Sequence, residues 1–111
     1  MIASGNLFSV IDAKAQEGEI FTRLLELPGL RIERIVSTGQ ASQPGFWYDQ
    51  PETEWVVLLK GEAAVRLQAE DIPRVLKPGD WLELPPHCRH RVEWTASDQE
   101  TVWLAVHHKV S

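Results

Sequence analysis

Side chains suited to acid-base chemistry gather in the second half of the chain, which contains all of its histidines: His87, His90, His107 and His108. An imidazole titrates near neutral pH, so it can move protons or bind a metal ion. His107 and His108 are neighbours, so on a strand they point to opposite faces and at most one of them points inward. We expect a solvated pair at the end of the strand. His87 follows a pair of prolines, and we expect it in a loop exposed to solvent.

The single cysteine, Cys88, could be a nucleophile. Its neighbour Arg89 could lower the pKa of the thiol, which would favour the reactive thiolate. No histidine-and-acid pairing is evident around it in the sequence, so we expect a structural thiol. One cysteine cannot form an intramolecular disulfide and fits a reducing compartment.

Composition narrows the class of protein. The chain has 111 residues, of which 43% are hydrophobic and 24% charged, and its net charge is −5. These values suit one globular domain and exclude disorder throughout. No run of Lys and Arg indicates nucleic-acid binding, and no apolar run could span a bilayer. Residues 1–8 lack the features of a signal peptide, so we expect a soluble, cytoplasmic protein.

Short alternating or apolar segments between turn residues predict a protein built from strands. We expect strands over residues 20–27, 30–37, 55–60, 63–68, 73–76, 81–84, 89–95 and 101–108. Eight or nine short strands at regular spacing are typical of a sandwich or barrel. Residues 7–17 predict a short helix. No repeat or linker divides the chain, so residues 1–111 are expected to form a single domain.

Two stretches, residues 47–61 and 78–90, resemble the two sequence motifs of the cupin family. Glu54 and Gly61 match the end of the first motif, and Gly79, Pro85 and His90 match the second at the correct spacing. The resemblance covers about residues 20–108. It implies an all-β fold, a double-stranded β-helix or jelly-roll barrel, preceded by a short N-terminal helix or extension.

The chain departs from the cupin motifs at the positions that matter for chemistry. The two histidines of the first motif fall at Tyr48 and Gln50, or at Trp47 and Asp49 if a longer spacing applies. The other changed positions are the leading glycine, the glycine of the second motif and its closing asparagine, which are here Ser42, His87 and Trp94.

In cupins the two motif histidines, the glutamate and the later histidine bind a metal ion inside the barrel. The resemblance therefore implies a site for one divalent ion, iron, zinc, manganese or nickel, at Gln50, Glu54 and His90. Only one imidazole and one carboxylate remain as strong ligands. The alternative is a metal-free cluster, in which Gln50 donates to Glu54 and Glu54 accepts from a protonated His90. His107 or His108 is the one reserve imidazole that could replace a lost ligand.

The resemblance also predicts which side chains surround the site. Tyr48, Leu58, Leu82 and Val92 are expected to line a ligand pocket, with Tyr48 as a possible proton donor and no other catalytic residue assigned. In strand 89–95, Val92 and Trp94 should share the face of His90.

A further expectation concerns the strand after Glu54, which is apolar on both faces. Val56 and Leu58 should point inward with Glu54, and Trp55 should point outward. A strand that is apolar on both sides needs a second cover. Small cupins form dimers of this kind, so we expect a homodimer with Trp55 and Trp81 as interface anchors.

Three functions are open from the sequence. The first is a metal-dependent enzyme for oxygenation, isomerisation or lyase chemistry on a small substrate. The second is a non-catalytic module that binds a small molecule in the barrel, and the third is a metal-free regulator that acts through its surface. The missing motif histidines favour the second and third. Whether the protein is an enzyme is left open, because the cupin fold serves many functions.

Overall fold

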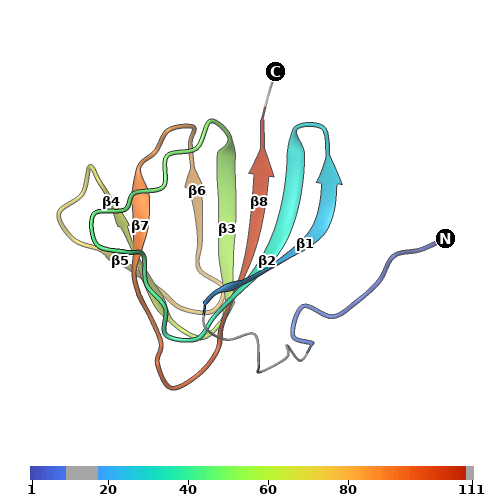
Figure 1. Cartoon of the computed structure of the whole chain (residues 1–111), viewed down its shortest axis with the longest axis horizontal. Helices are drawn as coiled ribbons and strands as arrows, with labels where there is room; N and C mark the ends of the chain where they lie inside the picture. Colours follow the sequence, from blue (N-terminus) through green and yellow to red (C-terminus); the bar gives the residue numbers. More distant parts are fainter. Residues whose placement is uncertain (10–17, 110–111) are drawn as a thin grey trace.

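The computed structural model describes residues 1–9 and 18–109, which contain eight strands in two antiparallel sheets (Figure 1). The larger sheet has the strand order β1-β2-β8-β3-β6, and the smaller has the order β5-β4-β7. The strands are β1 Ile20–Leu27, β2 Leu30–Ser37, β3 Thr53–Lys60, β4 Ala63–Leu67, β5 Arg74–Leu76, β6 Trp81–Leu84, β7 His90–Thr95 and β8 Thr101–His108. The predicted all-β fold is thus confirmed, and the eight strands lie close to the ranges expected from the sequence.

The core lies between the two sheets. Its buried side chains come from both of them and are Val56, Leu58, Ala63, Val65, Leu76, Trp103 and Ala105. The Trp103 indole Nε1 donates a hydrogen bond to Ser37 Oγ at 3.2 Å, and Ser37 Oγ donates to Glu19 Oε2 at 2.6 Å. A buried indole needs such a partner for its N–H group. The core packing and this hydrogen bond therefore fix the position of Trp103 between the two sheets.

The turn between β3 and β4 requires the glycine that the first cupin motif supplies. Gly61 has a φ of +91°, and a Cβ atom on it would lie 2.7 Å from both Glu100 O and Thr101 Cα. A side chain would meet backbone at that distance, and the left-handed conformation is itself unfavourable for other residues. Gly61 therefore lets β3 turn directly into β4.

A β-bulge in β7 corrects one prediction. Val92 pairs with Val65, but Trp94 pairs with Ala64, so one extra residue separates the two pairs. An extra residue reverses the alternation of side chains between the faces of a strand. Trp94 consequently leaves the face that Val92 occupies and is 39% exposed. The expectation that it shares the inner face with His90 is wrong.

The predicted helix over residues 7–17 is not supported. Its described part, residues 7–9, begins with a turn in which Asn6 Oδ1 accepts a hydrogen bond from the Phe8 backbone N–H at 2.7 Å. An asparagine side chain can satisfy the backbone in this way without a helix. Residues 10–17 lie outside the described residues. Nowhere in the described ranges is there a helix long and apolar enough to cross a membrane.

Candidate functional site

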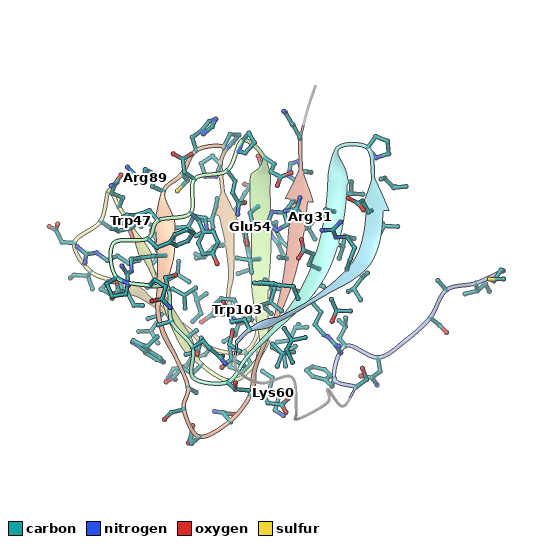
Figure 2. All side chains as sticks on the ribbon, viewed as in Figure 1. Arg31, Trp47, Glu54, Lys60, Arg89 and Trp103 are labelled. Atoms are coloured by element: carbon teal, nitrogen blue, oxygen red, sulfur yellow. The ribbon has the colours of Figure 1, made fainter. Side chains whose placement is uncertain are left out.

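A cavity of about 210 Å³ lies between the sheets and is lined by side chains of both. Its apolar wall consists of Ile35, Val56, Val65, Leu84, Val92 and Trp103, and its polar wall includes Arg31, Glu33, Tyr48, Gln50, Glu54, His90 and His107. Figure 2 shows Glu54 and Arg31 towards one end of the barrel and Trp103 nearer the other. The cavity thus has a polar end and an apolar floor.

The register of the large sheet assembles the polar wall. His107 of β8 is paired with Arg31 of β2 on one side and with Glu54 of β3 on the other. Residues that are directly opposite on neighbouring strands point to the same face, with their Cβ atoms about 5 Å apart. Three ionisable side chains from three strands therefore form one row across the inner face of the sheet.

Glu54 and His90 form a buried ion pair across the cavity. His90 Nε2 lies 3.5 Å from Glu54 Oε1, and their side chains are 9% and 12% exposed. The other ring nitrogen, Nδ1, lies 2.8 Å from the Cys88 carbonyl oxygen, which can only accept. Burial lowers the pKa of His90, but the Glu54 carboxylate and the Cys88 carbonyl outweigh this effect and raise it above its ordinary value. His90 can therefore act as an acid, and it contacts a carboxylate.

Tyr48 lies against His90. The two residues form an isolated antiparallel bridge, and their rings stack with centroids 5.3 Å apart. Burial raises the pKa of the Tyr48 phenol, and the nearby carboxylates of Glu19 and Glu54 raise it further. The phenol therefore stays protonated at neutral pH and can donate a hydrogen bond into the cavity.

The backbone around Tyr48 places alternate residues on opposite sides. Gln50 lines the cavity with Tyr48, and its Oε1 atom is buried without a hydrogen-bond partner in the described residues. Asp49 points away and contacts exposed His87, with Oδ1 and Nδ1 2.7 Å apart. Trp47 also lies elsewhere, 5.9 Å from the Arg91 guanidinium. Of the two registers that the sequence left open, Tyr48 and Gln50 are the pair in the cavity.

His87 occupies the position of the glycine in the second cupin motif. Its φ of +61° is the left-handed conformation that glycine adopts easily. Its backbone N–H donates to the Gln50 carbonyl at 2.6 Å, which holds the loop in this shape. As expected, His87 is exposed at the rim.

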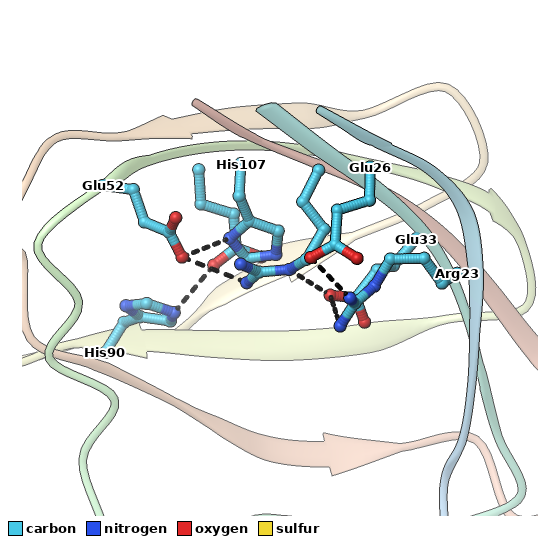
Figure 3. A network of polar contacts seen from close by, with 8 residues as sticks. Arg23, Glu26, Glu33, Glu52, His90 and His107 are labelled. Carbon is cyan, nitrogen blue, oxygen red and sulfur yellow. Dashed lines mark hydrogen bonds and ion pairs between the residues drawn. The ribbon is translucent and has the colours of Figure 1, made fainter. Parts of the chain in front are cut away.

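His107 is the histidine of the last strand that enters the barrel, where it is 5% exposed. The expectation of a solvated pair is therefore wrong for His107. Its Nδ1 atom lies 3.8 Å from Glu52 Oε1, too far for a hydrogen bond. Arg31 contacts the same Glu52 oxygen through Nη2 at 3.0 Å and donates to Glu33 through Nε. Figure 3 shows these contacts continuing to Arg23 and Glu26 on β1.

Sequence reasoning missed Arg31, Glu33 and Glu52 as members of the site. The available signal was the spacing of Arg31 and Glu33, two residues apart on a strand and hence on one face. Charged residues usually lie on the solvent side of a strand, so this signal did not point inward.

The predicted pocket residues do not all reach the cavity. Tyr48 and Val92 line it, whereas Leu58 is fully buried in the core and Leu82 packs against that core. Cys88 lies on the rim, and burial, together with Glu70, raises the pKa of its thiol. Arg89 is not among the groups that shift this pKa, so nothing among the described residues activates the thiol, and the structural thiol expected from the sequence stays a prediction.

The residues at the cupin metal positions do not fit a resident metal ion. His90 and Glu54 supply one imidazole and one carboxylate, whereas a resident divalent ion usually needs at least three strong protein ligands. The Tyr48 phenol holds its proton, and Gln50 offers only a neutral oxygen. The described residues contain no group of three or more His, Cys, Asp or Glu side chains arranged to hold a metal.

Comparison with known proteins agrees with this fold. A family model described as "Cupin domain" matches residues 34–107. A "putative mannose-6-phosphate isomerase" from Ralstonia eutropha JMP134 is 52% identical, with a TM-score of 0.94 over 98% of this chain and 100% of that one. No curated protein matches.

Two more distant solved structures share the fold alone. A cupin superfamily protein from Desulfitobacterium hafniense DCB-2 is 17% identical, with a TM-score of 0.71 over 86% of this chain and 81% of that one. The cupin domain of Schizosaccharomyces pombe Cnp3 is 12% identical, with a TM-score of 0.78 over 99% and 71%. The matched residues and the 52% identical relative establish that the chain belongs to the cupin family.

Proposed function

We propose that this protein binds a small organic molecule in its barrel without a resident metal ion. The observation that carries the proposal is the cavity itself, with the Glu54–His90 ion pair on one wall and Trp103 on its floor. A concave, mainly apolar site with a few convergent polar groups is the usual form of a ligand site.

The size of the cavity limits the ligand. Drug-sized ligands occupy pockets of roughly 300–1,000 Å³, whereas this cavity measures about 210 Å³. The ligand is therefore smaller than a drug-sized molecule. One end of it meets Tyr48, Gln50 and Glu54, and the other end meets the apolar floor.

A second candidate function is aldose–ketose isomerisation, which the name of the Ralstonia eutropha relative suggests. This reaction moves one hydrogen from C2 to C1 and another from O2 to O1. The Glu54 carboxylate would take the proton from C2 and return it to C1, while the protonated His90 would give its proton to O1 and take the one from O2. A phosphate group fits this cavity poorly, because Glu19, Glu33 and Glu54 line it and Arg31 is already held by carboxylates.

Calorimetric titration of metal-free protein tests the main proposal. The probe is benzyl alcohol, which has a hydroxyl group for the polar end and a ring for the apolar floor. We expect binding in the presence of EDTA and a loss of about tenfold in affinity in Glu54→Gln, because one hydrogen bond to a charged group is lost. A requirement for added metal would contradict the proposal.

A separate assay tests the isomerase candidate. Metal-free protein is incubated with D-mannose and with D-mannose 6-phosphate, and the ketose formed is measured. Turnover of either sugar that disappears in Glu54→Gln would establish the isomerase. No turnover, together with binding of benzyl alcohol, would leave the binding function alone.

A further inference from the structure

The polar wall of the cavity contains more carboxylates than cationic side chains. The carboxylates of Glu19, Glu33 and Glu54 line it, together with the amide oxygen of Gln50. The cationic side chain in the lining besides His90 is Arg31. Acceptors without water or protein donors are costly in a buried site, so they favour a ligand that donates.

The cations of the site already have carboxylate partners. Arg31 contacts Glu33 and Glu52, and His90 is paired with Glu54. Glu19 accepts from the neutral hydroxyl of Ser37. Arg23 adds a longer contact to Glu33 at 4.0 Å but is also bound by Glu26 at 2.9 Å. The carboxylates thus outnumber the cations around the cavity, and an anionic ligand would meet no free cation among these groups.

Two atoms on the cavity wall have no hydrogen-bond partner in the part of the chain that is described. These are Gln50 Oε1 and the Nδ1 atom of His107, whose side chain is 6% exposed. The amide oxygen of Gln50 can only accept, so it needs a donor, whereas the His107 nitrogen donates or accepts according to its tautomer. Unpaired buried polar atoms of this kind are rare in proteins unless they have a functional reason.

We infer that the ligand is a small primary amine or amidine with a short apolar body, whose cationic group is held by the acceptors of Gln50, Glu54 and Glu33. This inference rests on the proposed binding function and adds the ligand class. The ammonium or amidinium group supplies several donors and a positive charge that balances the excess of carboxylates. The apolar body lies against Trp103 and Val56.

Three probes of one shape test the ligand class: benzylamine, benzyl alcohol and benzoate, which are cationic, neutral and anionic at neutral pH. Each is titrated by calorimetry into metal-free protein with EDTA present. We expect benzylamine to bind about tenfold more tightly than benzyl alcohol, and benzoate more weakly than both. Glu33→Gln should reduce the ratio between the amine and the alcohol, and the matched control Glu26→Gln, on an exposed carboxylate of the same network, should preserve it.

The outcomes separate the two proposals. If benzyl alcohol or benzoate binds as tightly as benzylamine, the ligand class is wrong while the binding function stands. If none of the three binds, the binding function fails and the ligand class fails with it. If both variants lose the preference for the amine equally, the preference comes from net charge alone. That result would overturn the role of the cavity wall.

Discussion

In the large sheet, β2, β3 and β8 carry charged side chains on the inner face, whereas β3 and β6 carry tryptophans on the outer face. This is the reverse of an ordinary half-exposed sheet, whose outer face is polar. Arg31, Glu54 and His107 form a row on the inner face. On the outer face the same strands carry Trp55, which is paired with Val106, and β6 adds Trp81. Trp55 and Trp81 lie 5.9 Å apart, and Trp81 is 58% exposed. The charged row is inside, and the aromatic pair is outside.

We infer from this difference that the two faces suit different kinds of partner. Buried ionisable groups are costly unless they are paired or serve a site, and exposed apolar patches on a sheet commonly mark an interface. The outer face also carries charged residues. Glu83 is paired with Trp55, and Arg34 is paired with Leu104 and contacts Ser9, whose Oγ lies 3.0 Å from Arg34 Nη1. We therefore assign the inner face to a small ligand and expect a second copy of the chain on the outer one.

Removing the carboxylate on the inner face should have the largest effect. Glu54→Ala leaves the His90 imidazole buried without its partner, and breaking a buried pair costs about 3 kcal/mol. We expect this loss in the free energy of unfolding, measured with urea at pH 6, where the imidazole is protonated. The control is Asp49→Ala, which breaks the exposed pair with His87 and should cost about 0.5 kcal/mol. Equal losses in the two variants would show that burial does not distinguish these pairs.

The outer face should produce the next largest effect. The homodimer expected from the sequence remains a prediction, and Trp81→Glu places a charge beside Trp55 in its expected interface. A tryptophan at the centre of an interface contributes about 2 kcal/mol, so the dissociation constant of the dimer should rise roughly 30-fold. Sedimentation equilibrium measures this change. Trp94→Glu alters an exposed tryptophan of the other sheet and serves as the control; a monomeric wild-type protein would contradict the prediction.

Titration of His90 on the inner face should change stability with pH, by less than the two substitutions above. The pKa of His90 is higher in the folded protein than its ordinary value of about 6.5. Its contribution to stability is therefore complete below pH ~6.5 and is lost as the pH rises through the folded pKa. We expect the melting temperature to fall over this range in the wild type. In His90→Gln this part of the fall in melting temperature with pH should vanish. An unchanged fall would show that His90 is not its source.

The sequence was sufficient for the strands but not for the composition of the site. Turn residues such as Pro28-Gly29 and Gly79 mark strand ends through local backbone preferences, so the places of the strands along the chain could be predicted. The contact between Arg31 and Glu52 depends on how β2, β8 and β3 pair in space, which local patterns do not encode. Trp94 was misplaced for a related reason, because a bulge of one residue leaves no clear signal in sequence alternation.

The smallest effect is expected at the rim, outside both faces. His87→Gly restores the glycine of the cupin motif at a φ of +61°. Relief of backbone strain and loss of the exposed contact with Asp49 oppose each other, so the free energy of unfolding should change by less than about 1 kcal/mol. Affinity for benzyl alcohol should stay within twofold of the wild type, roughly the error of such measurements. A large loss of affinity would extend the ligand site to the rim.

The most direct test of the account is an NMR titration of metal-free protein with benzyl alcohol, followed through the indole N–H signals. Trp103 lies on the cavity floor, whereas Trp55 and Trp81 lie on the outer face. We predict that the Trp103 signal shifts with added probe while the signals of Trp55 and Trp81 remain in place. Shifts confined to the outer tryptophans, or no shift of Trp103 until metal is added, would contradict a metal-independent ligand site inside the barrel.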